Sequence, residues 1–156
     1  MKLDNVDVRL LAELQQDGRR PVVELAERVG LSPTPCARRI RQLEEAGIIQ
    51  GYAAQIDPAR LGLGVRAFVQ VKLERHTDEN IERFNEALAA LDEVVSCHAT
   101  TGDHDFMLQV LTADLESLSN IVLRSLLRIP GVRDVKSSLA LQTFKQSLRL
   151  PLGHLR

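Results

Sequence analysis

Apolar residues near the start of the chain recur every three or four positions, which is the spacing that places them on one face of a helix. Three such sets occur: Leu10, Leu11 and Leu14; Val22, Leu25, Ala26 and Val29; and Cys36, Ile40 and Leu43. Asp4, Pro21 and Ser32 stand at the expected helix starts, where capping side chains and proline are favoured. Gly30 and Gly47 follow the second and third sets, as glycine commonly does at a helix end. The pattern predicts three helices.

The second and third predicted helices form a helix-turn-helix motif. Only the three residues from Gly30 to Ser32 separate them, and a short turn with glycine is typical of this motif. The segment "IIQGYAAQI" that follows is short and apolar, which indicates a β-ribbon or wing, and "DPARLGLGV" has the composition of a linker. We therefore predict a winged helix-turn-helix domain over residues 1–51 and a wing and linker over residues 52–64.

From residue 65 onward, segments of strand and helix pattern alternate. The strand "VRAFVQVKL" has apolar residues at every second position. The helix "DENIERFNEALAAL", the strands "EVVSCHATTG" and "DFMLQVLT", the helix "DLESLSNIVLRSLLRI" and the strand "GVRDVKSSLALQTF" follow it. The order βαββαβ is that of the ferredoxin-like fold. The predicted fold class is α+β, and residues 65–156 form the second domain.

Composition and charge restrict the class of protein. The chain is 44% hydrophobic, which is enough for packed cores, and its net charge of −1 says nothing about partners. No apolar run has the length of a membrane span, and the N-terminus lacks the pattern of a signal peptide, so we expect a cytoplasmic protein without a membrane partner. Cys36 and Cys97 are far apart in sequence, which favours reduced thiols over a disulfide or a zinc site.

The third predicted helix has arginines on the side opposite its apolar face. Thr34, Arg38 and Arg41 lie on that side, Gln42 lies near it, and Arg39 lies closer to the apolar edge. The second helix of a helix-turn-helix enters the major groove of DNA, so we predict double-stranded DNA as the partner. Base and backbone contacts are expected from these side chains, and Ser32 is expected to bond a phosphate at the helix N-terminus.

An arginine-rich helix face also has a plainer interpretation. Such a face is often only solvated, and Glu44 and Glu45 are available for local salt bridges. The tight helix-turn-helix context favours DNA binding over this alternative. The aromatic content of 3% is too low for an aromatic platform that stacks unpaired bases, which favours a duplex over single strands.

The stretch "TTGDHDFML" is the second candidate site. His98, Asp103, His104 and Asp105 are metal-ligand residue types, but neighbours in a strand point to opposite sides, so a metal site is not favoured. Carboxylates and N–H groups beside a sheet edge suit the ammonium and carboxylate of an amino acid better, and a plain connecting turn is the alternative. We find no nucleophile paired with a base and no phosphate loop, so we predict neither an enzyme nor a bound cofactor.

With both halves considered, the chain resembles the Lrp/AsnC family of feast/famine regulators over almost its full length. The stretches that carry the resemblance are "LDNVDVRLLAELQQDGR", "ELAERVGLSPTPCARRIRQLEEAGIIQGY", "TGDHDFML", "LLRIPGVRDVKSSLAL" and "FKQS". The resemblance implies an N-terminal winged helix-turn-helix that binds DNA. It also implies a βαββαβ domain of the RAM type that dimerises, assembles further, often into octamers, and binds a small effector, commonly an amino acid.

The resemblance also assigns individual residues. It adds Pro35 to the recognition-helix segment, and it places Gly102, Asp103 and Asp105 in the family's Gly-Asp-x-Asp loop at an effector cleft between dimers. Two last-strand positions that face the effector in some members correspond to Val135 and Ser137. Some members that take basic amino acids have threonine at both positions, so the apolar Val135 favours leucine or methionine over lysine. The alternative function is an amino-acid-sensing or assembly protein that does not read DNA.

Overall fold

The computed structural model describes residues 2–155, which divide into two compact units. The first unit runs to Gln55 and also contains the segment from Lys145 onward, and the second unit is Ile56–Phe144. The predicted ranges 1–51 and 65–156 include the first and last residues, which lie outside the described part of the chain. No helix in the described part is long and apolar enough to cross a bilayer.

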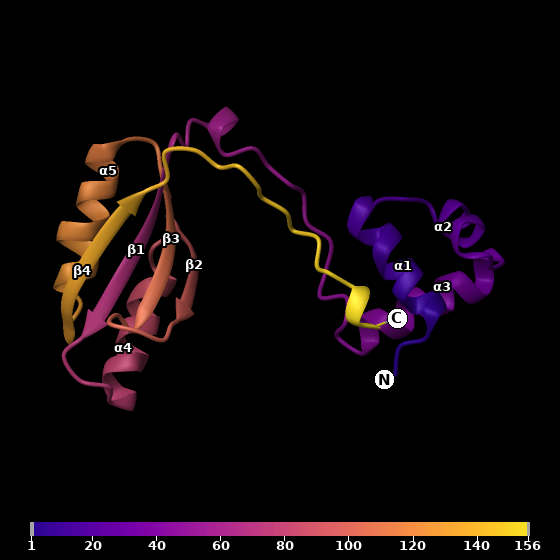
Figure 1. Cartoon of the computed structure of the whole chain (residues 1–156), viewed down its shortest axis with the longest axis horizontal. Helices are drawn as coiled ribbons and strands as arrows, with labels where there is room; N and C mark the ends of the chain where they lie inside the picture. The colour runs from indigo at the N-terminus through magenta and orange to yellow at the C-terminus, as the bar shows by residue number, and fades with distance from the viewer. Residues whose placement is uncertain (1, 156) are drawn as a thin grey trace. The chain divides into compact units, whose positions relative to one another are not determined.

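The first unit contains three helices, as predicted (Figure 1). They are α1 Asn5–Gln16, α2 Val22–Val29 and α3 Pro33–Glu45. The Asp4 carboxylate caps α1 by accepting hydrogen bonds from the N–H groups of Val6 and Asp7. Gly30 ends α2 with a φ of 76°, a left-handed conformation that favours glycine, and this bend starts the turn to α3. The buried core of the three helices consists of Leu10, Leu25, Ala26, Val29 and Cys36.

The predicted β-ribbon after α3 is not formed. Between Ala46 and Gly64 the described chain contains turns, irregular segments and a single 3-10 turn, Ala59–Leu61. A strand is stable only when a second backbone satisfies its N–H and C=O groups. Within residues 2–155 no second strand pairs with this segment, so its apolar residues do not form the predicted ribbon.

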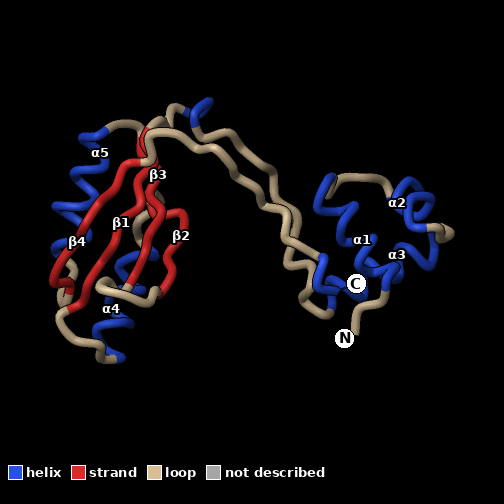
Figure 2. The backbone as a smooth tube through the Cα atoms, viewed as in Figure 1, coloured by secondary structure: helices blue, strands red, loops and turns tan. Residues whose placement is uncertain are grey.

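The second unit has the predicted βαββαβ order. Its elements are β1 Val65–Leu73, α4 Asp78–Ala89, β2 Val94–Ala99, β3 Phe106–Thr112, α5 Leu115–Asn120 and β4 Val132–Leu139. The sheet order is β2-β3-β1-β4, and all neighbouring strands are antiparallel (Figure 2). The last predicted helix is interrupted, because α5 ends at Asn120 and a π-helical and a 3-10 turn continue it to Arg128.

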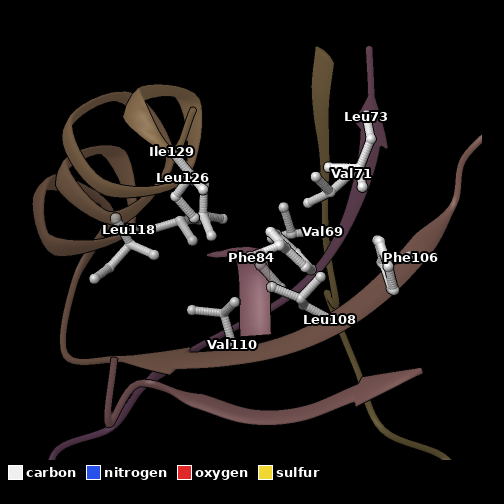
Figure 3. Close-up of a cluster of buried hydrophobic side chains, with 12 residues drawn as sticks. Val69, Val71, Leu73, Phe84, Phe106, Leu108, Val110, Leu118, Leu126 and Ile129 are labelled. Atoms are coloured by element: carbon white, nitrogen blue, oxygen red, sulfur yellow. The ribbon is translucent and has the colours of Figure 1, made fainter. Parts of the chain in front are cut away.

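One face of the sheet packs against the helices. Phe84 of α4 and Leu118 of α5 meet the strand residues Val69 and Leu108 in a single buried cluster (Figure 3). The Phe84 ring lies 4.7 Å from the ring of Phe106, measured between centroids. The alternate residues of β1 point to the other face, where 42% of Phe68 is exposed.

The C-terminal segment departs from the predicted domain boundary. We expected all of residues 65–156 in one domain, but the segment from Lys145 packs with the three helices of the first unit. The Gln15 side chain of α1 binds the Leu150 backbone twice: Nε2 donates to the carbonyl at 3.3 Å, and Oε1 accepts from the N–H at 2.5 Å. Leucines of the segment and of α1 line an apolar groove of about 620 Å³ between them, and this shared apolar surface explains the packing.

The contacts of Gln15 predict a local opening of the C-terminal segment when they are removed. Gln15→Ala deletes both hydrogen bonds to Leu150, so we expect faster amide exchange at Leu150, measured by NMR, with little change elsewhere. The neighbouring residue Gln16 is exposed, so Gln16→Ala serves as the matched control. Unchanged exchange at Leu150 in Gln15→Ala would contradict the prediction.

Candidate nucleic-acid interface and effector site

The start of α3 presents polar groups at its exposed end. Ser32 holds the N-cap position with extended backbone angles, as predicted, but its side chain makes no capping hydrogen bond. Pro33 occupies the first helical turn, where a missing N–H costs nothing. Ser32 and Thr34 are exposed, and Pro35 is half-buried. The helix N-terminus therefore combines an exposed hydroxyl with backbone N–H groups, which suits an anion such as phosphate.

The outer face of α3 carries two arginines that are available to a ligand. Cys36 and Leu43 on the inner face are fully buried, whereas Arg38, Arg41 and Gln42 are exposed. Among the ion pairs within residues 2–155, none involves Arg38 or Arg41. Both guanidinium groups are therefore free to meet phosphates or guanine edges.

Arg39 has a different environment. Its Nη1 atom lies 2.7 Å from a carboxylate oxygen of Asp4 and 2.7 Å from one of Asp7. The hydrogen bonds to Asp7 and then Asp4 raise the pKa of Arg39, and the Asp7 N–H and the Arg39 guanidinium lower the pKa of Asp4. Asp7 belongs to α1, and only 4% of its side chain is exposed. Its ion pair with Arg39 therefore attaches α3 to α1 at a buried position. The structure thus uses Arg39 within the protein, and a direct DNA contact by Arg39 stays a prediction.

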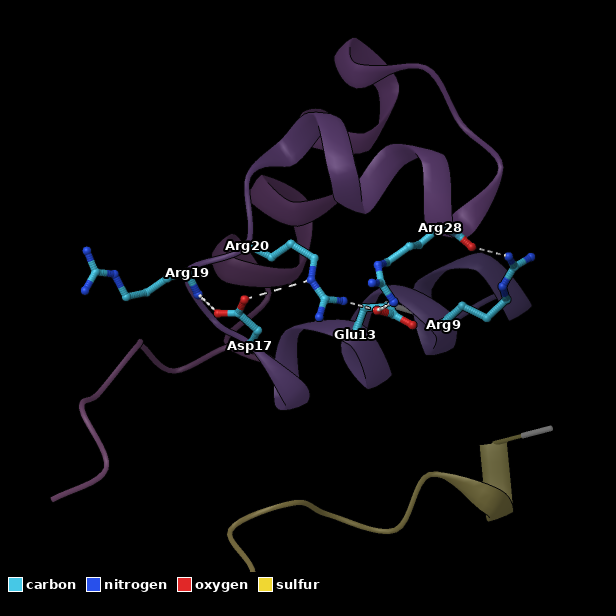
Figure 4. Close-up of polar contacts among 6 residues, drawn as sticks. All are labelled: Arg9, Glu13, Asp17, Arg19, Arg20 and Arg28. Carbon is cyan, nitrogen blue, oxygen red and sulfur yellow. Dashed lines mark hydrogen bonds and ion pairs between the residues drawn. The ribbon is translucent and has the colours of Figure 1, made fainter. Parts of the chain in front are cut away.

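Other arginines of this unit are also engaged within the protein (Figure 4). Glu13 of α1 forms ion pairs with Arg20 and, at 3.3 Å, with Arg28. Arg9 donates a hydrogen bond to the backbone carbonyl of Arg28 at 2.7 Å. These contacts link α1 to α2, and they leave Arg38 and Arg41 on α3 as a separate exposed pair.

The second candidate site is the loop between β2 and β3. Thr100 closes the loop, since its N–H donates to the Asp105 carbonyl at 2.9 Å and its hydroxyl donates to the His104 carbonyl at 3.2 Å. Gly102 has a φ of 116°, which favours glycine, and it lies with Asp103 in the exposed part of the loop. Backbone N–H groups and one carboxylate therefore reach solvent together.

Asp105 attaches this loop to the end of β1. Its N–H donates to the Val71 carbonyl at 2.9 Å, and its Oδ2 accepts the Leu73 N–H at 2.7 Å. Burial raises the pKa of Asp105. The Leu73 N–H, His76 and Lys72 together lower it by more than this, so the net pKa lies below the usual value. The carboxylate is thus ionised at neutral pH and engaged inside the chain.

Val135 and Ser137 lie on the neighbouring strand β4. Val135 pairs with Val71, and Ser137 pairs with Val69, so both lie on the helix-covered face of the sheet. Val135 packs against the core, whereas Ser137 is exposed. Because Asp105 also bonds to Val71, the loop and β4 flank the same residue of β1. The structure thus brings these sequence-predicted residues to either side of β1 in one sheet.

Sequence reasoning missed His76. Its Nε2 lies 2.6 Å from Oδ1 of Asp105, although the two residues are 29 positions apart. The only signal was topological, because β1 pairs with β3 and the end of one lies beside the start of the other. No group of three or more His, Cys, Asp or Glu side chains within the described residues could hold a metal ion.

Comparison with known families accounts for both units. Residues 3–44 match the AsnC-type helix-turn-helix domain, and residues 66–150 match the Lrp/AsnC ligand binding domain. The chain belongs to the Lrp/AsnC family. Members of this family are transcriptional regulators rather than enzymes. The helix-turn-helix and the βαββαβ unit are therefore the DNA-binding and the ligand-binding domain of an Lrp/AsnC regulator.

Relatives and solved structures agree with this family. The chain is 43% identical to the Leucine-responsive regulatory protein of Escherichia coli K12 over 148 residues, which cover 95% of this chain and 90% of that protein. It superimposes with a TM-score of 0.94 on a Neisseria meningitidis transcriptional regulator in complex with L-Met, at 44% identity and 99% coverage of both chains. An AsnC family regulator from Agrobacterium tumefaciens gives a TM-score of 0.92 at 36% identity, over 97% of this chain and 99% of that one.

The position of Arg39 predicts a loss of stability when it is removed. Arg39→Met removes the cationic partner of the buried Asp7 carboxylate and leaves only the Asp4 N–H bonded to it, which is expected to lower the free energy of unfolding by about 1–3 kcal/mol. Urea denaturation followed by circular dichroism measures the change. Arg38→Met removes the same charge from the exposed face and is expected to alter stability by less than about 0.5 kcal/mol. Equal effects of the two substitutions would contradict the structural role of Arg39.

Proposed function

We propose that this Lrp/AsnC regulator reads double-stranded DNA through the exposed face of α3. The observation that carries the proposal is the pair Arg38 and Arg41, which is exposed and outside the ion pairs of the described chain on the second helix of a helix-turn-helix. An arginine can bind guanine O6 and N7 in the major groove or a backbone phosphate. The proposed contact residues are Ser32, Thr34, Pro35, Arg38, Arg41 and Gln42, and Arg39 positions them.

We further propose that the effector is an amino acid with an apolar side chain, leucine or methionine rather than lysine. The apolar Val135 supports this choice, as do a relative named for its response to leucine and a similar structure that contains L-Met. The exposed Asp103 carboxylate suits the ammonium group, and the backbone at Gly102 suits the carboxylate. Ser137 and Asp105 complete the proposed site, Asp105 as the residue that holds its loop.

The proposed active form is a homo-oligomer, a dimer that assembles further into an octamer, acting in the cytoplasm. The helix-free face of the sheet, with the half-exposed Phe68, offers an apolar surface to a second copy. Several helix-turn-helix units in one assembly bind spaced operator sites with avidity. An effector changes DNA binding only if it binds two assembly states or two arrangements of these units with different affinity.

The first test is loss of DNA binding in Arg38→Ala/Arg41→Ala. Losing two base or phosphate contacts is expected to weaken binding by at least roughly 30-fold and to reduce its salt dependence. Fluorescence anisotropy with DNA from upstream of the protein's own gene, at fixed salt, measures the affinity. The control Arg124→Ala/Arg128→Ala removes the same charge from the second unit. A folded Arg38/Arg41 variant that binds as tightly as wild type would instead favour an assembly or sensing protein that does not read DNA.

The second test concerns the effector. Titration calorimetry is expected to show binding of leucine or methionine and weaker or no binding of lysine. Val135→Thr is expected to weaken binding of the apolar amino acids several-fold because it replaces a methyl group with a hydroxyl. Val95 is exposed on β2, so Val95→Thr is the matched control. Lysine binding together with no response to leucine or methionine would overturn the proposed specificity.

A further inference from the structure

Hydrogen bonds hold three residues of the loop between β1 and α4, namely Glu74, Arg75 and Thr77. The Glu74 N–H donates to the carbonyl of Gly131 at 2.8 Å, and the Asn80 side chain donates to the Arg75 carbonyl at 3.0 Å. The Thr77 hydroxyl caps α4 by accepting the Asn80 N–H at 3.3 Å. Residue 76, between these anchors, is therefore mounted on a fixed backbone.

Gly131 adds to this anchoring. It has a φ of 91°, and a Cβ at this position would lie 2.9 Å from the Asn80 side chain. The close approach is possible only with glycine. Gly131 directly precedes β4, so the 74–77 loop is attached to the start of the strand that carries Val135 and Ser137.

His76 extends from this loop to the base of the β2–β3 loop. Its Nε2 lies 2.6 Å from Asp105 Oδ1, while Asp105 Oδ2 accepts the Leu73 N–H at 2.7 Å. Both carboxylate oxygens of Asp105 thus have partners within the chain. An aspartate in this state holds the loop rather than offering a free carboxylate to a ligand, and Asp103 is the exposed carboxylate of the loop.

We propose that His76 is a positioning residue for effector binding, which fixes Asp105 and thereby the part of the loop that contains Gly102 and Asp103. The proposal rests on the proposed function of this loop as the effector site. Through Glu74 and Gly131, the same short segment holds the start of β4. His76 therefore connects the two groups of proposed effector residues without itself contacting the effector.

The contact between His76 and Asp105 joins an imidazole to an ionised carboxylate. The pKa of Asp105 is below its usual value, so its carboxylate is charged at neutral pH, and a hydrogen bond to a charged group is stronger than a neutral one. Lys72 lies near Asp105, and Glu74 and Arg75 precede His76 in the same loop. A second histidine–aspartate contact joins Nε2 of His104 to Asp134 at 3.5 Å.

The exposure of His76 limits the size of the effect. Because 62% of the His76 side chain is exposed, solvent screens its contact with Asp105. Removing the imidazole is therefore expected to weaken effector binding by only about two- to fivefold.

The experiment is titration calorimetry of the full-length protein with L-methionine and with L-leucine. His76→Ala is expected to bind the amino acid more weakly than wild type by the stated factor. His76→Gln keeps a hydrogen-bond donor for the Asp105 carboxylate, so its affinity is expected to be close to that of wild type.

Two other histidines provide matched variants. His98 is exposed on β2, so His98→Ala is expected to retain wild-type affinity. His104→Gln removes the neighbouring histidine–aspartate pair and is also expected to retain it. Wild-type affinity in His76→Ala would overturn the proposal, as would an equal loss of affinity in His98→Ala.

A second readout does not require the effector. In amide NMR spectra, His76→Ala is expected to shift the Leu73 and Gly102 signals, and His76→Gln is expected to restore them toward wild type. Unchanged signals in His76→Ala would overturn the positioning role. If wild type binds neither amino acid while these shifts occur, the proposed effector fails and the positioning of the loop stands.

Discussion

Burial of apolar surface is the constraint on which the two candidate functional faces depend. On α3, burial of Cys36 and Leu43 determines which side chains remain outside, and Arg38 and Arg41 are among them. On the sheet, burial of alternate residues on the helix side leaves the intervening residues on the opposite face. In both units most candidate functional side chains lie next to residues that packing buries, and packing sets their spacing.

Polar residues in the candidate sites divide into those that hold the backbone and those that meet solvent. Arg39 and Asp105 resemble their neighbours in sequence, yet each has two partners inside the protein. Arg38 and Asp103 are exposed beside them. This division follows from geometry, because adjacent residues on a helix or in a loop point in different directions. The holding residues give the exposed ones a fixed position, which reduces the conformational entropy lost on binding.

Periodicity and turn residues were sufficient to predict most of the fold. The three helices, the short turn at Gly30 and the βαββαβ order are local patterns, and the structure confirms them. The missing ribbon after α3 and the position of the C-terminal segment were not predictable in this way, because both depend on which distant segment provides a partner. The π-helical interruption after Asn120 likewise has no signal in the spacing of apolar residues.

For the sites, residue types identified the two regions but not the role of each side chain. The ion pairs of Arg39 with Asp4 and Asp7 span more than thirty positions, and His76 meets Asp105 only because β1 and β3 are neighbours. Contacts at such separations are set by packing of whole elements. Sequence spacing alone therefore did not show whether Arg39 and Asp105 hold the backbone or bind a ligand.

The segment from Lys145 also affects how the protein is made. During synthesis the three helices emerge first, then the βαββαβ unit, and only afterwards the residues that pack on α1. Domains generally fold in the order of their synthesis, so the apolar side chains of α1 that face this segment stay uncovered until the segment is made. A chain cut before Lys145 keeps this surface exposed, and exposed apolar surface favours association with other molecules.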